Sequence, residues 1–255
     1  MMITTYICNT QYLLSLKTFL KAFLILLFLI SLCHADDIEN REKTIVSGII
    51  NAYGGKEQLS KVVSILAEGR IKNLFDKDEG TYFRYMKRDK KLIVDIKYSR
   101  SEEKRILIGD KGYSGTGGKV SEVKGAPYDA MVYQYNQLDL PYGLIDNTFK
   151  VTYLRKDRLG GVDTDVLKLV DKSGHNIDVY VGAKDFLILK VVGTFGMGDS
   201  TMSLAAEFSD YRKLDGILLP FKITNYADTT KISETEITKY AINPPIDESA
   251  YFSVR

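Results

Sequence analysis

Residues 207–226 have the sequence EFSDYRKLDGILLPFKITNY, and this stretch decides the fold class. Apolar and polar side chains alternate over Met202–Ser209, and the alternation resumes over Ile217–Ile223 after the dipeptide Asp215-Gly216. A period of two places successive side chains on opposite faces of a β-strand, and Asp-Gly supplies the positive φ angles of a tight hairpin turn. The stretch therefore predicts a hairpin with one polar and one apolar face, and the apolar face covers either a packed core or a lipid.

Strand patterns of similar length recur on both sides of this hairpin. Short turns such as Gly160-Gly161 and Ser173-Gly174 separate them. Connections this short join antiparallel neighbours, since a parallel crossover needs a dozen or more residues. The sequence thus predicts a mainly β (α+β) fold, a single curled antiparallel sheet of about eleven strands that forms an open half-barrel. The expected strands are residues 65–71, 80–88, 91–98, 103–109, 149–156, 162–170, 176–181, 186–194, 202–211, 217–226 and 231–242.

Two or three helices are expected to cover this sheet. The first precedes Gly54-Gly55, where a left-handed cap belongs, and a short helical turn follows over Lys56–Lys61. Pro127 is placed to start a further helix, and Pro141 ends it. One face of this last helix carries Tyr128, Met131, Tyr135 and Leu138, which are spaced as one helical face requires.

The first 35 residues have the pattern of a secretory signal peptide. They contain no acidic residue, and Lys17 and Lys21 precede an unbroken apolar run over residues 22–30. That run is about half of the roughly 20 residues that a membrane-spanning helix needs. Cleavage is expected after Ala35, which leaves residues 36–255 as one exported half-barrel domain. The alternative is an uncleaved N-terminal anchor.

Both cysteines, Cys8 and Cys33, lie within this leader. The mature chain would then have no disulfide, no zinc-thiolate site and no thiol nucleophile. Cys33 itself offers a further alternative, because Ile30-Ser31-Leu32-Cys33 resembles a lipidation site whose residue before the cysteine is larger than usual.

The charge of the mature chain is balanced. The whole sequence has 35 basic and 33 acidic residues, and removal of Lys17 and Lys21 leaves 33 of each. A net charge of zero without a basic cluster argues against nucleic-acid binding. We expect no cofactor and no metal.

Four motifs suggest chemistry, and each has a simpler structural interpretation. His175 follows a turn and is interpreted as a solvated side chain, because no nucleophile motif accompanies it. Asp76–Gly80 resembles the start of a calcium loop but lacks its final Glu, which favours an acidic hairpin turn. Gly112–Gly118 resembles a phosphate loop but is interpreted as a flexible strand connection. Asp163 and Asp165 are interpreted as a solvated strand end. The chain is therefore not expected to be an enzyme.

Several of these segments together resemble a known family. They are the leader, the helix end Ala52–Gly55, the strand Ala67–Ile71, and the hairpin Glu207–Tyr226 followed by Ile232–Glu234. The chain resembles bacterial outer-membrane lipoprotein-sorting proteins, which are similar to the periplasmic carriers LolA and LolB. The resemblance implies an eleven-stranded half-barrel covered by helices, with a cavity between sheet and lid that holds acyl chains, and it places the mature protein in the periplasm.

The chain departs from the carriers in one motif. In LolA a strand of the form Lys-Arg-Pro leads into a segment with an arginine tied to lid closure and lipoprotein release. Here Lys87-Arg88 is followed by Asp89, and the nearest corresponding positions are apolar. Arg84 and Arg70 are the two candidates for that arginine.

The sequence and the resemblance together support two functions. The first is a carrier or chaperone that binds the acyl chain of a lipoprotein or another lipid, contacts the membrane transiently and works as a monomer. The alternative is an envelope signalling or docking module that binds a protein partner with the same fold and exposes an apolar patch outside the cavity. The expected ligand-binding residues are Leu92, Val94, Ile96, Phe208, Leu219, Phe221 and Ile223 on the sheet, with Met131 and Tyr135 on the lid.

Overall fold

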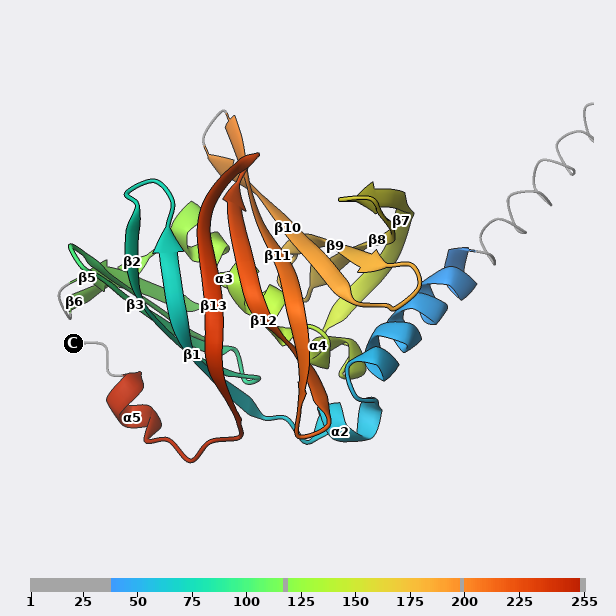
Figure 1. Cartoon of the computed structure of the whole chain (residues 1–255), viewed down its shortest axis with the longest axis horizontal. Coiled ribbons are helices and arrows are strands. Elements are labelled where there is room, and N and C mark those ends of the chain that lie inside the picture. The colour runs from blue at the N-terminus through green and yellow to red at the C-terminus, as the bar shows by residue number, and fades with distance from the viewer. Residues whose placement is uncertain (1–37, 117–118, 198–199, 253–255) are drawn as a thin grey trace, which may run out of the picture. The chain divides into compact units, whose positions relative to one another are not determined.

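The computed structural model describes residues 38–116, 119–197 and 200–252 (Figure 1). The predicted signal peptide and its cleavage site lie outside these residues. The chain divides into two compact units, residues 1–43 and 44–255. In the first unit, residues 38–43 are helical, and Lys43 Nζ lies 2.7 Å from Glu39 Oε1, one turn earlier. The sheet, the core and the cavities belong to the second unit. None of the helices within the described residues is long and apolar enough to cross a membrane.

One antiparallel sheet dominates the second unit. In the described residues it has thirteen strands in the order β6-β5-β4-β3-β2-β1-β13-β12-β11-β10-β9-β8-β7 (Figure 1). The terminal strands β6 and β7 lie at opposite ends of this order, so the sheet is open, as predicted. The strands are β1 (Ser64–Asn73), β2 (Asp78–Lys87), β3 (Lys91–Tyr98), β4 (Glu102–Ile108), β5 (Lys111–Thr116), β6 (Lys119–Val123), β7 (Phe149–Leu159), β8 (Val162–Asp171), β9 (Asn176–Gly182), β10 (Ile188–Met197), β11 (Ser200–Leu214), β12 (Ile217–Ala227) and β13 (Thr230–Ile242).

The two strands beyond the predicted eleven are β5 and β6, which come from the glycine-rich segment Gly112–Gly118 and the residues after it. Over residues 112–116 the interpretation as a flexible connection is wrong, because these residues belong to β5; residues 117–118 lie outside the described residues. The glycines of this strand permit close packing. A Cβ atom on Gly115 would lie 1.8 Å from the Lys119 carbonyl oxygen across the pair of strands. A Cβ atom on Gly112 would lie 3.1 Å from Met131 Sδ, where a helix crosses the strand.

Five helical segments accompany the sheet in the described residues. The first covers residues 38–52, and α2 (Lys56–Ser60) follows it, both close to the predicted positions. The predicted central helix is α3 (Ala126–Asp139), with Pro127 in its first turn. The short helix α4 (Tyr142–Ile145) comes next, and α5 (Glu248–Tyr251) lies near the C-terminus.

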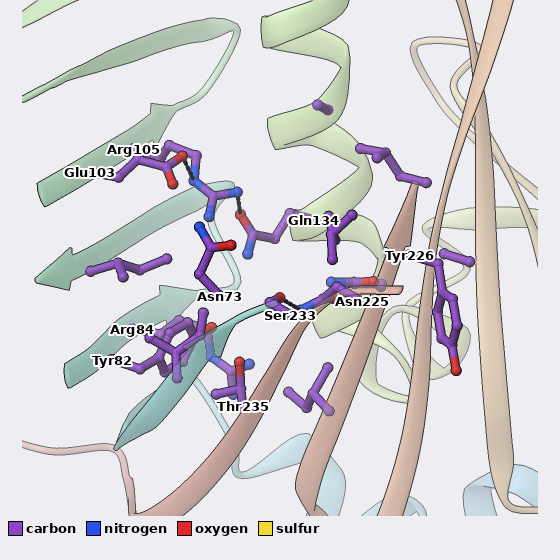
Figure 2. Close-up of a pocket in the computed structure, with 18 of the residues that line it drawn as sticks. Asn73, Tyr82, Arg84, Glu103, Arg105, Gln134, Asn225, Tyr226, Ser233 and Thr235 are labelled. Atoms are coloured by element: carbon purple, nitrogen blue, oxygen red, sulfur yellow. Dashed lines mark hydrogen bonds and ion pairs between the residues drawn. The ribbon is translucent and has the colours of Figure 1, made fainter. Parts of the chain in front are cut away.

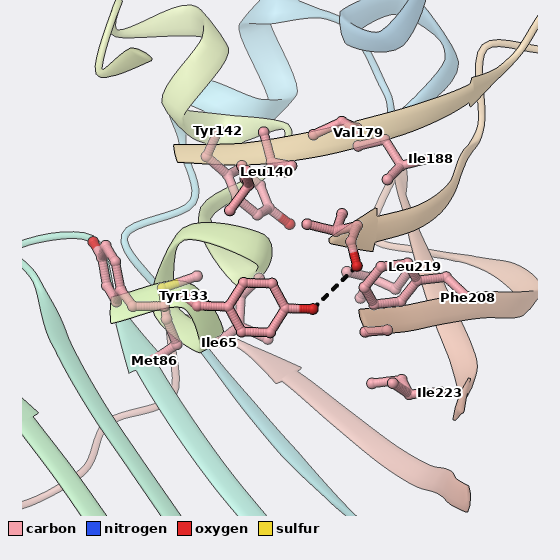
Figure 3. Packing of buried hydrophobic residues seen from close by; sticks show 14 of the residues in the cluster. Ile65, Met86, Tyr133, Leu140, Tyr142, Val179, Ile188, Phe208, Leu219 and Ile223 are labelled. Carbon is pink, nitrogen blue, oxygen red and sulfur yellow. Dashed lines mark hydrogen bonds between the residues drawn. The ribbon is translucent and has the colours of Figure 1, made fainter. Parts of the chain in front are cut away.

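The sheet curls around α3. The helix contacts β4 and β5 on one side and β9 and β10 on the other, although these pairs of strands are far apart in the sheet order. The sheet face that packs against α3 is called the inner face here. In cross-strand register Tyr82, Arg84 and Met86 of β2 lie opposite Ile96, Val94 and Leu92 of β3 on this face. The main hydrophobic core lies between the inner face and the helices (Figure 3).

The helix end and the hairpin that the sequence predicts pack against each other. Asp215 and Gly216 have φ angles of 50° and 82°, so the predicted hairpin turn is confirmed. Gly54 and Gly55 have φ angles of 130° and 83° after the first helix. The Leu218 backbone N–H donates to the Tyr53 carbonyl at 3.1 Å, and this bond joins the helix end to the start of β12.

The outer face of the sheet is covered in part by the C-terminal segment, which the sequence did not predict. The ring of Tyr251 in α5 stacks on Phe83 with centroids 5.4 Å apart. Glu248 accepts hydrogen bonds from Lys87 at 2.7 Å and Lys91 at 2.9 Å, and these contacts lower the pKa of its carboxyl to about 2. The segment thereby shields outer-face side chains of β2 and β3.

Replacement of Phe221 by alanine is expected to lower the free energy of unfolding by about 2 kcal/mol. The ring is partly buried, lies edge-on to Tyr240 with centroids 5.1 Å apart, and carries the Arg212 guanidinium 4.5 Å from its centre. Lys222, the next residue, is exposed, and Lys222→Ala is expected to change that free energy by less than about 0.5 kcal/mol. Urea denaturation of both variants measures the difference, and equal losses would contradict the assigned burial of this strand.

Candidate functional site

A cavity lies between the inner face and α3 (Figure 2). Its volume is about 320 Å³, near the lower limit of the range of about 300–1,000 Å³ that is usual for small-molecule sites. Ile71, Ile96 and Ile223 contribute apolar surface from three separate strands. Polar groups share the lining, and the exposed ring of Phe75 also lies on it. A site with this mixed lining suits an amphiphile better than a plain hydrocarbon.

A second, smaller cavity of about 50 Å³ adjoins the first. Arg84, Gln137 and Ile223 line both cavities, so the two spaces meet at these side chains. Phe208 and Leu219 provide apolar lining in the smaller one. The two cavities together extend from the exposed Phe75 into the core.

The helix α3 presents four side chains to the larger cavity, namely Ala130, Tyr133, Gln134 and Gln137. Tyr133 anchors the helix, because its hydroxyl donates to the Val191 carbonyl at 3.1 Å (Figure 3). Burial raises the pKa of this tyrosine far above its ordinary value, which keeps the hydroxyl a neutral donor. The ring passes directly over Gly193, where a Cβ atom would lie 2.4 Å from it. The glycine is therefore what lets the helix approach β10.

The sequence-predicted binding residues are divided between these cavities and the core. Ile96 lines the larger cavity, Phe208 and Leu219 line the smaller one, and Ile223 lines both. The other five line neither of the two: Leu92, Val94, Met131, Tyr135 and Phe221.

These five side chains miss the two cavities because of the orientation of α3 and the close packing of the core beside it. Met131 is buried against β5 at Gly112, and the Tyr135 hydroxyl accepts a hydrogen bond from the Lys90 backbone N–H at 3.2 Å. Leu92 and Val94 are 1% and 0% exposed within the core cluster. The helix face expected to form the lid thus packs against strands, and the neighbouring face covers the cavity.

Arg84 was one of two sequence candidates for the arginine tied to lid closure, but it was not among the expected ligand-binding residues. It is 5% exposed, it lines both cavities, and its guanidinium carbon lies 5.9 Å from the centre of the Tyr240 ring. Arg84 Nε has no hydrogen-bond partner among the described residues. The signal in the sequence was its position between Tyr82 and Met86, which places a charge on the apolar face of an alternating strand. Arg70, the other candidate for a lid-binding arginine, is exposed.

Arg105 lines the same cavity but differs in its partners (Figure 2). Its Nε lies 2.9 Å from Glu103 Oε1, and its Nη1 donates to Gln134 Oε1 at 3.0 Å. The charge of Arg105 is therefore balanced by a neighbouring carboxylate, and its contact with Gln134 ties the sheet to α3.

Besides the glycine-rich segment, two more of the four weak motifs differ from their sequence interpretation. His175 is not a freely solvated turn residue, because its ring nitrogens lie 3.4 Å from Asp129 on α3 and 3.4 Å from Asp171 on β8. Asp163 is exposed as expected, but Asp165, two residues further along β8, is only 1% exposed.

The acidic turn after β1 has the expected structural role. Asn73 Oδ1 accepts from the backbone N–H groups of Phe75 and Asp76, which closes the turn. Asp78 accepts a hydrogen bond of 2.6 Å from the Ser99 hydroxyl, and this contact lowers the pKa of its carboxyl. No group of three or more potential metal ligands occurs in the part of the chain that the structure describes.

No protein-family profile and no curated protein matches the sequence. Solved structures do match. A putative outer membrane lipoprotein-sorting protein domain from Vibrio parahaemolyticus is 14% identical, with a TM-score of 0.52 over 84% of this chain and 97% of that one. A DUF1329 family protein from Desulfovibrio piger is 16% identical, with a TM-score of 0.53 over 83% and 97%. A LolA superfamily protein from Nitrosomonas europaea is 13% identical, with a TM-score of 0.51 over 82% and 96%.

These likenesses span most of each chain, and they confirm the predicted resemblance at the level of the fold. The chain has the open antiparallel half-barrel of the lipoprotein-sorting and LolA superfamily structures. Sequence identities of this size establish a shared fold and not a shared function. A function must therefore be argued from the geometry of the cavities.

Proposed function

We propose that this protein is a periplasmic carrier that holds a lipidated protein or another hydrophobic cargo between its sheet and α3. The observation that carries the proposal is the cavity of about 320 Å³ beneath the helix that crosses the open half-barrel. Binding requires no covalent step. Cargo would be held by removal of its apolar surface from water, which contributes about 0.8 kcal/mol for each buried methylene group.

The attachment of α3 is compatible with a lid. Side-chain contacts that tie it to the sheet include Tyr133 to the Val191 carbonyl, Gln134 to Arg105 and Asp129 to His175. A net contribution of about 1 kcal/mol is typical for one such hydrogen bond. Displacement of the helix leaves the strand ladder intact, but it breaks these contacts and exposes the buried side chains of Met131, Val132 and Tyr135, a cost that bound apolar cargo would have to offset. A cargo larger than the cavity would enter by this displacement.

The exposed apolar side chains favour the cavity over a docking patch. The large ones in the described part of the chain are Ile38, Val63, Phe75, Leu154 and Val162, and they come from separate segments. Phe75 belongs to the lining of the larger cavity, so its exposure marks the cavity mouth. A docking module would expose a contiguous patch instead.

A cavity-filling variant tests the proposal. Ala130→Trp places an indole in the larger cavity from α3, and we expect it to weaken the binding of a fluorescent fatty-acid probe at least about tenfold, because the probe loses its buried contacts. The matched control is Lys222→Trp, which adds the same side chain at an exposed position of β12. Fluorescence titration measures both dissociation constants, and circular dichroism confirms that both variants are folded.

The control is expected to bind like the wild type. Equal affinities in Ala130→Trp and Lys222→Trp would show that the probe binds elsewhere. If the wild type binds no probe at micromolar concentration while native mass spectrometry of envelope-purified protein shows a bound protein partner, the docking module replaces the carrier.

A further inference from the structure

We propose that the junction of the two cavities binds the oxyanion head of a single-chain amphiphile, with Arg84 as its counter-ion. This inference rests on the proposed carrier function and names the class of cargo. Arg84 and Gln137 line both cavities, and Tyr142 lines the smaller one beside them. The junction is therefore walled by polar side chains in an otherwise apolar part of the core.

The charge of Arg84 is buried without a carboxylate. A guanidinium stays protonated in proteins, and burial of an unpaired charge is strongly unfavourable for folding. Within the described residues no ion pair includes Arg84. Burial disfavours its charge, and the hydroxyls of Tyr82 and Tyr240 stabilise it. Arg105, 27% exposed on the same cavity, already has Glu103 at 2.9 Å. Of these two cavity arginines, Arg84 is the one that an added anion would neutralise.

Two further polar groups at the junction point to the same ligand chemistry. Gln137 Oε1 and Tyr142 Oη are buried and have no hydrogen-bond partner among the described residues, as is true of Arg84 Nε. The tyrosine hydroxyl is a donor, and a glutamine side chain presents its NH₂ group after rotation of the amide. Burial also raises the pKa of Tyr142 well above its ordinary value, so its hydroxyl keeps the proton. Three side chains that can donate line the same small cavity, and they fit a carboxylate or phosphate group, which offers only acceptors.

The lining of the larger cavity indicates where the hydrocarbon chain of the ligand lies. From the junction, the larger cavity continues along Ile71, Ile96 and Ile223 and includes the exposed Phe75. A hydrocarbon chain attached to the bound head would lie on these side chains and leave beside Phe75. The volume of about 320 Å³ is small for a ligand site and favours one chain over two or three. The head lies inside, so the ligand is a free amphiphile such as a fatty acid or an alkyl phosphate.

The test compares ligands that share a chain and differ in the head. Isothermal titration of the full-length mature protein with palmitate, hexadecyl phosphate and 1-hexadecanol is expected to show about ten- to hundredfold tighter binding of at least one anionic ligand than of the alcohol, as a charge-assisted hydrogen bond implies. Arg84→Gln should abolish this preference and leave the affinity for 1-hexadecanol unchanged. Palmitate and hexadecyl phosphate separate a carboxylate site from a phosphate site.

Arg105→Gln is the matched control, since it removes a cavity charge that Glu103 already balances. It should alter the preference for the anion by less than about threefold. The melting temperature of ligand-free Arg84→Gln should be equal to or above that of the wild type, because an unpaired buried charge is removed.

The outcomes that contradict the anion site differ from those that contradict the carrier function. Equal binding of the acid, the phosphate and the alcohol would overturn the anion site and leave the carrier function standing. Equal weakening of all three ligands by Arg84→Gln, with a lower melting temperature, would make Arg84 a structural residue and also overturn it. Absence of binding by all three, together with no probe binding in the Ala130→Trp experiment, would overturn the carrier function itself.

Discussion

Replacement of Gly54 by alanine is expected to lower the free energy of unfolding by at least about 3 kcal/mol. Gly54 has a φ angle of 130°, which residues other than glycine rarely adopt. A Cβ atom at this position would also lie 2.6 Å from the Gly216 carbonyl oxygen in the turn between β11 and β12. The added Cβ atom is attached to the backbone of the helix end, and the oxygen it meets belongs to the backbone of the hairpin turn. The clash is therefore relieved only if the helix end moves away from the hairpin.

Gly55→Ala separates the two causes of this loss. Gly55 also has a positive φ angle of 83°, but no atom lies within 4 Å of a Cβ atom built on it. Its substitution carries only the conformational cost, about 1–2 kcal/mol. Chemical denaturation of both variants gives the two free energies. A loss in Gly54→Ala no larger than in Gly55→Ala would mean that the helix end and the hairpin turn are not in contact.

The second large effect concerns the stability of the protein as a function of pH. Asp139 ends α3 and is 3% exposed, and burial raises the pKa of its carboxyl from 3.8 to about 7. Arg88 Nε, 3.6 Å from Asp139 Oδ1, opposes this rise, and the nearby Asp146 adds to it. The raised value means that burial outweighs the attraction of the arginine. At neutral pH and above, the folded protein therefore carries a poorly compensated buried carboxylate.

The sign of the dependence follows from proton binding in the two states. Between about pH 4 and pH 7 the folded state holds a proton on Asp139 that the unfolded state has lost, so the free energy of unfolding falls as the pH rises through this window. A shift of about three pKa units corresponds to a contribution of at most about 4 kcal/mol. Below the window both states are protonated, and above it both are ionised.

Asp139→Asn removes the ionisation and keeps the size of the side chain. We expect it to raise the free energy of unfolding at pH 8 by up to about 4 kcal/mol and to change it by less than about 1 kcal/mol at pH 4. Denaturation curves from pH 4 to pH 8 measure both. Asp163→Asn is the control, since Asp163 lies on β8, its side chain is 74% exposed, and it is not among the groups that shift the pKa of Asp139. Its pH profile should follow the wild type, and an unchanged slope in Asp139→Asn would refute the raised pKa.

The alternating strands and their turns were predictable because they depend on neighbours in the sequence. Asp215-Gly216 adopts the positive φ angles that a tight turn requires, and Gly54-Gly55 adopts those of a helix cap, whatever lies around them. Pro127 marks the start of α3 for an equally local reason. The two extra strands escaped prediction because Gly112 and Gly115 have no side chain to show an alternating pattern. Their role appears only when β4, β6 and α3 lie against them.

The amino-acid sequence by itself determined the open antiparallel sheet, its hairpins and the helix that crosses it, since period, turn chemistry and proline position are local properties. Only the tertiary structure decided which side chains line a cavity. The curl of the sheet turns Met131 and Tyr135 toward the strands and brings Gln137 and Tyr142 to Arg84, although these residues are far apart in the sequence. Contacts of that kind depend on cross-strand register and helix rotation, which no short stretch of sequence encodes.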